Sequence, residues 1–137
     1  MTQLTEDQTL IVDTARAFAQ EQLRPNASRW EDEGLNRDVL KELAALGFGC
    51  IYVREDVGGS GLTRLDAALI FEELSRGCIS TAAFLSIHNM CAWMIDAFGD
   101  EALRQRFLPQ LVTMEKISSY CLTEPGSGSD AAALRPT

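Results

Sequence analysis

The sequence predicts a mainly α-helical protein, with up to six helices over residues 6–114 and a strand that starts near residue 117. Two observations support this fold class. Apolar residues recur at helical spacing through the first 114 residues, and each periodic segment is bounded by a capping residue, a proline or a glycine. The run ISSYCLT then alternates and is rich enough in β-formers to indicate a strand.

The first two predicted helices contain few helix-breaking residues, and their ends have clear sequence signals. A capping box, TEDQ, begins at Thr5 and starts a helix over about 6–23. Pro25 breaks this pattern and can open a short second helix through Trp30, which Gly34 ends.

The third helix and the segment after it are predicted from clear signals. Asn36 is a suitable N-cap, and the apolar face continues to Gly47. The run FGCIYV that follows is short, apolar and β-prone, which favours a solitary extended segment. The next run, REDVGGSGLT, must be a loop, whose glycines either satisfy positive φ and close packing or face a ligand.

Thr63 can cap a fourth helix that runs to Gly77. The positions expected to be buried are Leu65, Leu69, Ile70, Phe71 and Leu74. The positions expected to face outward or toward a partner are Glu72, Glu73 and Arg76.

The fifth helix, over about 80–98, is apolar on almost every side and is therefore expected to be central and covered by its neighbours. Gly99 ends it and Asp100 caps a sixth helix. Pro109 is expected to kink this last helix or to end its first part.

The composition excludes several classes of partner. Twelve basic and 20 acidic residues give a formal charge of −8, which is the wrong sign for nucleic acid or for an anionic membrane surface. No segment is apolar and long enough to cross a bilayer, and the first residues resemble neither a signal nor a transit peptide. We therefore expect a cytoplasmic protein, or a mitochondrial matrix protein if a eukaryotic chain has been processed.

The four cysteines and the single histidine are not expected to form a metal site. Cys50, Cys78, Cys91 and Cys121 form no C-x-x-C pair and lie in apolar segments, which is typical of free thiols in a reducing compartment. His88 is the only histidine, so a metal centre is not expected. In the most apolar helix, His88 can be either a hydrogen-bonded core residue or a ligand-facing one.

The run YCLTEPGSGSD carries the most chemical information. A Gly/Ser loop after a strand can converge main-chain N–H groups on an anion, although the same composition also suits a turn between strands. It contains neither a P-loop nor a dinucleotide fingerprint. Glu124 and Asp130 could act as general acid or base in principle, but the sequence favours capping or turn roles for both.

This run resembles the flavin-contact signature of the acyl-CoA dehydrogenase family, a strand followed by T-E-P-x-x-G-S-D. Further segments fall in the order and spacing of the family's N-terminal helical domain: LTEDQ, LGFGCIYVREDVGGSGL, EELSRGC, SIHNMCAWMI and FGDEALRQRFLP. The resemblance covers essentially all 137 residues.

The resemblance implies a three-domain flavoenzyme that binds FAD and an acyl-CoA, is usually a homotetramer, and passes electrons to an electron-transferring flavoprotein. Residues 1–115 would form the N-terminal helical domain, and residues 116–137 would begin the middle β-domain. In the family, a glutamate of the C-terminal domain removes the α-proton, so no catalytic residue is expected in this chain. We expect the 137 residues alone to be inactive and to hold FAD poorly.

The resemblance also assigns residues to the site. The predicted flavin contacts are Tyr120, Cys121, Leu122, Thr123, Glu124, Pro125, Gly126, Ser127, Gly128 and Ser129. Within this run, Thr123 would hydrogen-bond the polar edge of the ring, and Ser129 would contact both flavin and CoA. The fifth helix would wall the acyl pocket, which suggests Ser86, His88 and Asn89 as substrate contacts.

Among subfamilies, the chain looks most like the isobutyryl-CoA dehydrogenases, which act on a short branched acyl-CoA in valine breakdown. Two alternatives stay open. The first is a dehydrogenase with another chain-length preference or an oxidase, because one methyl branch changes pocket fit by only about 1 to 3 kcal/mol. The second is a non-catalytic helical binding or assembly module.

Overall fold

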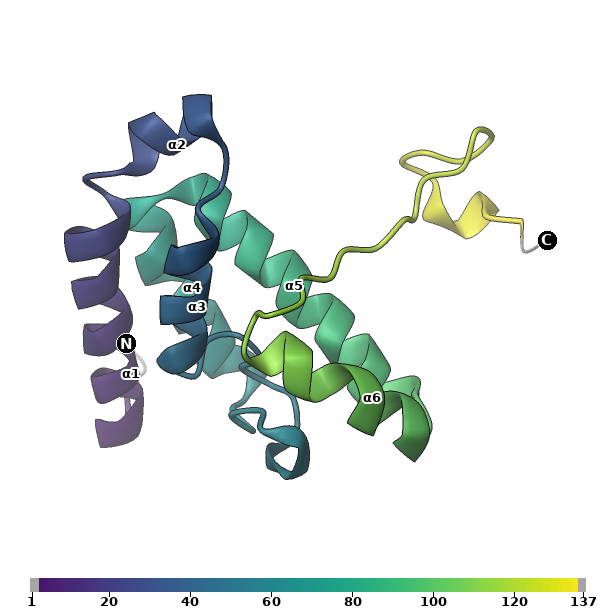
Figure 1. Cartoon of the computed structure of the whole chain (residues 1–137), viewed down its shortest axis with the longest axis horizontal. Helices are drawn as coiled ribbons and strands as arrows, with labels where there is room; N and C mark the ends of the chain where they lie inside the picture. Colours follow the sequence, from purple (N-terminus) through teal and green to yellow (C-terminus); the bar gives the residue numbers. More distant parts are fainter. Residues whose placement is uncertain (1–2, 136–137) are drawn as a thin grey trace.

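The computed structural model describes residues 3–135 and is built mainly from α-helices joined by loops, the longest of which lies between the third and the fourth α-helix (Figure 1). In chain order the α-helices are α1 (Glu6–Phe18), α2 (Ala27–Glu33), α3 (Arg37–Ala45), α4 (Arg64–Gly77), α5 (Ile79–Phe98) and α6 (Glu101–Val112). Three short elements complete the fold: the π-helix η1 (Ala19–Leu23) and the 3₁₀ turns η2 (Glu55–Val57) and η3 (Ala131–Ala133). The predicted mainly α fold with six helices is confirmed.

Local sequence signals explain where the helices begin. Thr5 and Thr63 each accept a hydrogen bond from the main-chain N–H three residues on, and both complete a capping box. Asn36 and Asp100 cap α3 and α6 through their side-chain oxygens. Because η1 continues α1 without a break, the first helical segment spans residues 6–23, as predicted.

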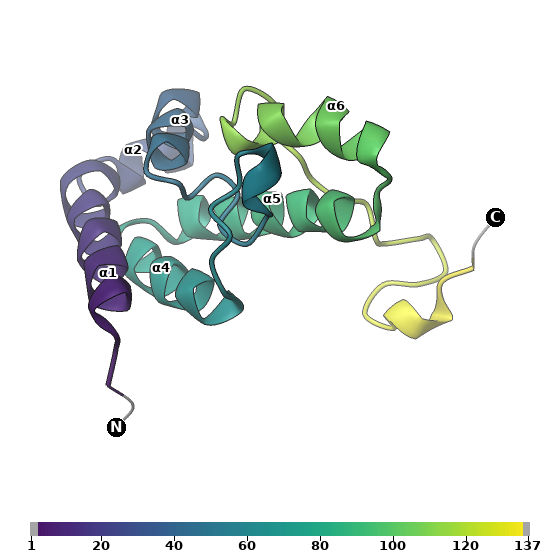
Figure 2. The ribbon, with the colours of Figure 1, turned by 90° about the horizontal axis from the view of Figure 1, so that it is seen from below.

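Helix α5 is the centre of the arrangement. It packs against α4 on one side and α6 on the other, and Figure 2 shows it running between them. The prediction that it is covered on all sides holds for only part of its surface. Ile79, Met94 and Phe98 are exposed, whereas Leu85, His88 and Asn89 are completely buried.

The loop between α3 and α4 differs from the prediction. Residues 49–52 form turns, so the expected extended segment is not present. Its carbonyl groups still find partners, because Cys50 and Ile51 accept hydrogen bonds from the N–H groups of Ser60 and Leu62 at 3.0 and 2.9 Å. The structural interpretation of the glycine-rich loop is correct: Gly58 has φ +91°, and a Cβ at Gly59 would lie 2.2 Å from the Val53 oxygen.

Helix α6 runs through Pro109 without ending there, which corrects part of the prediction. A proline inside a helix costs about 3 kcal/mol or more, because it removes a hydrogen bond and crowds the preceding turn. Here the ring is exposed, while Leu108 and Leu111 beside it are buried in the second apolar cluster of the core. Burial of this face offsets the cost of the proline.

The predicted burial pattern of α4 is wrong at two positions. Leu65 was expected in the core but is 57% exposed, and Glu73 was expected to face outward or toward a partner but is only 5% exposed within the chain itself. The carboxylate of Glu73 accepts hydrogen bonds from both Nε and Nη2 of Arg16, at 3.1 and 3.0 Å. This bidentate pair joins α1 to α4 and allows the carboxylate to be buried.

The strand expected over 117–123 is not formed among the described residues. This segment carries no helix and no sheet pairing, and leaves the helical body as a long trace (Figure 1). The one β-type pairing in residues 3–135 is an isolated bridge between Glu124 and Ser127. A strand needs a neighbouring strand for its hydrogen bonds, and no such neighbour lies beside residues 117–123 in this part of the chain.

Gly77→Ala is expected to destabilise the contact between α4 and η1. A Cβ at this position would lie 2.5 Å from the Ala19 oxygen and 2.9 Å from Leu23 Cβ. Since main-chain atoms cannot move aside easily, we expect the free energy of unfolding to fall by about 1 to 3 kcal/mol in urea titrations followed by circular dichroism. Gly126→Ala, where a Cβ meets nothing within 4 Å, is the control. Equal stability of the two variants would contradict this packing argument.

Candidate functional site

The chain passes from the helical body to the predicted flavin segment through residues 114–118. Met114 is buried and has a left-handed φ of 54°, which turns the chain away from α6. Ile117 is half-buried against the main core. Ser118 is tied to α5 by the His88 side chain. The position at which the tail leaves the body is therefore defined by side-chain contacts.

Both ring nitrogens of His88 are hydrogen-bonded. Nε2 lies 3.0 Å from the Leu111 carbonyl oxygen, and Nδ1 lies 3.1 Å from the main-chain nitrogen of Ser118. The ring is fully buried at 0% exposure. Burial lowers the pKa of His88, although the hydrogen bond with Leu111 acts in the opposite direction. The ring is therefore neutral at ordinary pH.

Asn89 holds the loop before α4 against α5. Its Oδ1 accepts from the Ile51 N–H at 2.6 Å, and its Nδ2 donates to the oxygens of Phe48 and Leu85 at 3.1 and 3.0 Å. The Ser86 hydroxyl donates to the Ala83 oxygen at 2.7 Å and is only half-buried. These hydrogen bonds show what the side chains do within the chain, and their contact with a substrate stays a prediction.

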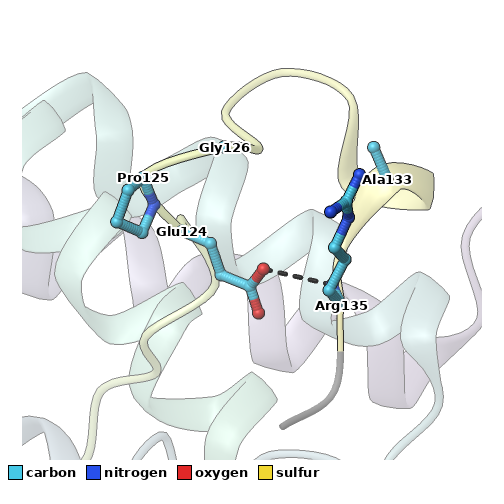
Figure 3. Close-up of a pocket in the computed structure, with 5 residues that line it drawn as sticks. All are labelled: Glu124, Pro125, Gly126, Ala133 and Arg135. Carbon is cyan, nitrogen blue, oxygen red and sulfur yellow. Dashed lines mark hydrogen bonds between the residues drawn. The ribbon is translucent and has the colours of Figure 1, made fainter.

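The TEPGSGSD segment forms a closed turn. The N–H and C=O groups of Glu124 and Ser127 hydrogen-bond to each other at 3.0 and 3.1 Å, and the Ser127 hydroxyl donates to the Asp130 carbonyl. The Glu124 carboxylate accepts the Arg135 N–H at 3.1 Å (Figure 3). The turn borders an open hollow of about 570 Å³, which is lined by Glu124, Pro125, Gly126, Ala133 and Arg135.

Other predicted flavin contacts are available to a ligand. Tyr120 and Leu122 are 42% and 43% exposed, and Cys121, Thr123 and Ser129 are exposed as well. Within residues 3–135, the N–H groups of Thr123 and Ser129 have no hydrogen-bond partner.

These residues fit a flavin cofactor by their chemistry. Exposed apolar side chains can cover a flat ring, while free N–H groups can donate to its polar edge or to a phosphate. A Cβ at Gly126 or Gly128 would meet nothing within 4 Å, so the main chain there is open to close approach. FAD presents both a flat ring and a pyrophosphate, and the segment offers groups for each.

The two acidic residues of the segment, Glu124 and Asp130, both take part in hydrogen bonds of its turn. The Glu124 carboxylate accepts the Arg135 N–H, whereas Asp130 accepts from Ser127 through its main-chain carbonyl and not through its carboxylate. No group of three or more metal-ligating side chains occurs among the described residues. All four cysteines are free thiols, and Cys121 is the exposed one. In the same part of the chain, no helix is long and apolar enough to span a membrane.

Sequence reasoning missed two sets of polar contacts in the helical body. The first is Ser118, whose N–H binds His88 across 30 residues of sequence. The second is an ionic cluster in which Asp96 of α5 joins Arg54 and Arg104. An aspartate and an arginine inside otherwise apolar helical faces were the available signals.

Comparisons with known proteins define the class of protein. The family model "Acyl-CoA dehydrogenase, N-terminal domain" matches residues 5–115. The structure of an acyl-CoA dehydrogenase complexed with FAD from Bacillus anthracis superposes with a TM-score of 0.85 and 33% identity, over 96% of this chain and 23% of that one. The chain belongs to the acyl-CoA dehydrogenase family.

Two curated relatives with high sequence identity to the chain are isobutyryl-CoA dehydrogenases. Mitochondrial isobutyryl-CoA dehydrogenase of Dictyostelium discoideum is 61% identical over 132 residues, and that of Bos taurus is 53% identical over 132 residues. Each alignment covers 96% of this chain and 32% of the relative. The chain thus spans about a third of the length of these relatives.

Proposed function

We propose that this chain supplies the N-terminal helical domain, and the start of the flavin-contacting segment, of an FAD-dependent dehydrogenase for short branched acyl-CoA substrates such as isobutyryl-CoA. The supporting observation is the 61% and 53% identity to two isobutyryl-CoA dehydrogenases over 96% of the chain. Residues 1–115 act as the helical domain, and residues 116–137 begin the next one.

The residues of this chain bind and orient the cofactor. Tyr120 and Leu122 cover the ring of FAD, Thr123 donates to its polar edge, and Ser129 lies between the flavin and the CoA part of the substrate. When bound, FAD accepts a hydride from the β-carbon of the acyl group. The proton acceptor for the α-carbon comes from outside this chain, so the 137 residues alone lack activity.

The partners follow from the same proposal. The enzyme forms a homotetramer and passes its electrons to an electron-transferring flavoprotein. Four free thiols suit a reducing compartment, either the cytoplasm or the mitochondrial matrix. The relatives cited above carry "mitochondrial" in their names, which favours the matrix.

A chimera tests the proposal. This chain replaces the matching 132 residues of the D. discoideum relative, and the purified protein is assayed for bound flavin by its visible absorbance and for turnover with a dye acceptor. We expect bound FAD and faster turnover of isobutyryl-CoA than of butyryl-CoA or 2-methylbutyryl-CoA. The unmodified relative is the control.

Each other outcome identifies an alternative. A folded chimera that contains no FAD, beside an active control, would contradict the flavin role and favour a non-catalytic helical module. Bound FAD with equal turnover of branched and straight substrates would support the family role and contradict the branched-chain preference. Electron transfer to oxygen at the rate seen with the dye would indicate an oxidase.

A further inference from the structure

Among the described residues, Ser118 makes the last hydrogen-bonded contact between the helical body and the chain that leads into the predicted flavin segment. Within residues 3–135, Ser118 is the last residue that hydrogen-bonds to the helices, and every later hydrogen bond lies inside the tail. Tyr120 follows only two residues later. Any movement of Ser118 therefore moves the start of the segment relative to α5.

The ring of His88 can make its two main-chain hydrogen bonds in one protonation state only. The Leu111 carbonyl only accepts, so Nε2 must carry the proton. The Ser118 N–H only donates, so Nδ1 must have a free lone pair. The Ser118 hydroxyl lies 3.1 Å from the same Nδ1 and 3.3 Å from the His88 carbonyl oxygen, to which it can donate.

We propose that His88 is a positioning residue for the flavin segment, because its neutral, Nε2-protonated ring joins the end of α6 to Ser118 and so fixes where the segment leaves the helical body. This inference rests on the proposed flavin role of residues 120–129. His88 acts through Ser118 and does not touch the cofactor itself. With both ring nitrogens engaged and the side chain fully buried, the ring has no free nitrogen for a substrate.

The state of the ring can be measured directly in the unmodified 137-residue chain. In ¹⁵N NMR spectra at pH 7.5, the two ring nitrogens of the single histidine should show the Nε2-protonated tautomer. A ring protonated at Nδ1, at both nitrogens, or exchanging between tautomers would overturn the proposal. This readout requires no cofactor and no variant.

Two substitutions separate the two hydrogen bonds. In His88→Asn the amide oxygen can replace Nδ1 and keep the Ser118 bond, whereas in His88→Gln the longer amide can replace Nε2 and keep only the Leu111 bond. We expect the Ser118 N–H to exchange with solvent about tenfold faster in the Gln variant than in the Asn variant. Equal exchange in both variants would contradict the tether.

The chimera then connects the tether to flavin binding. We expect His88→Gln to release FAD about tenfold more readily than His88→Asn and to shift the flavin absorbance bands, while thermal unfolding of the two variants differs little. Ser119→Ala, at the next and exposed position, is the control for changes in the tail. If the unmodified chimera lacks FAD, the proposed function is contradicted. If the unmodified chimera binds FAD and both His88 variants bind it equally, only the positioning role of His88 is contradicted.

Discussion

Asn89→Leu is expected to lower the free energy of unfolding by about 3 kcal/mol or more. The asparagine satisfies the Ile51 N–H and the Phe48 carbonyl inside the core, at 2.6 and 3.1 Å. Leucine has a similar size but no hydrogen-bonding group, so both main-chain groups would be left without partners. Each buried orphan group costs about 1 to 3 kcal/mol. Urea titrations followed by circular dichroism measure the difference.

The control for this prediction lies on the same helix. Ser86→Ala removes a half-buried hydroxyl that bonds only within its own helical turn, and we expect a change within about 0.5 kcal/mol. Hydrogen exchange adds a local readout, because the Ile51 N–H should lose its protection in Asn89→Leu. A variant that unfolds within 1 kcal/mol of the unmodified chain would show, on the scale above, that Asn89 is not needed to hold the loop.

The helices could be predicted because their signals are local. Thr5, Asn36, Thr63 and Asp100 cap helices through main-chain groups two or three residues away, and these contacts depend little on the rest of the fold. The predicted run at 117–123 depends on a neighbouring strand, which no local pattern supplies. Its β-propensity therefore did not produce a strand.

The error in the predicted burial of Glu73 also comes from a contact between residues distant in sequence. Glu73 is buried because Arg16, 57 residues earlier, neutralises and hydrogen-bonds its carboxylate. Helical periodicity cannot identify a partner so distant in sequence. Conversely, Leu65 is exposed although Asp66 and Ala67 beside it are buried, because the buried face of α4 continues through Ile70 and Leu74 and does not include Leu65.

The sequence could indicate which segment forms the candidate site, but it could not show how that segment is attached to the helices. Resemblance of YCLTEPGSGSD to a family signature predicts that this segment contacts the flavin, which stays a prediction, and the structure leaves Tyr120, Leu122 and Thr123 exposed. The sequence could not show how the segment is held, because the His88 to Ser118 bond joins residues 30 apart. Non-local hydrogen bonds of single buried side chains leave no periodic trace.

Asp96→Ala is expected to destabilise the protein by about 3 to 5 kcal/mol, as is usual when one partner of a buried ion pair is removed. The carboxylate, almost fully buried, accepts from the Arg54 main chain at 3.1 Å and from Nε of Arg104 at 2.9 Å. These groups connect the η2 loop, α5 and α6. Without Asp96, the buried guanidinium of Arg104 keeps only its more exposed partners, Asp56 and Glu101.

The loss of stability at low pH is a second, independent test of how much the Asp96 carboxylate stabilises the fold. Burial alone would raise the pKa of Asp96, but the hydrogen bonds from the Arg54 main chain and from Arg104 and Arg54 side chains outweigh it and lower the pKa below the usual 3.8. A lowered folded-state pKa stabilises the protein above pH 3.8 and loses this effect as the pH falls toward the folded value. Asp96→Asn should therefore lose less stability than the unmodified chain as the pH falls below 4. The control is Glu101→Gln, which changes an exposed partner of Arg104 and should retain most of the stability at neutral pH. If Asp96→Asn and the unmodified chain lose stability in parallel on acidification, folding does not lower the pKa of Asp96.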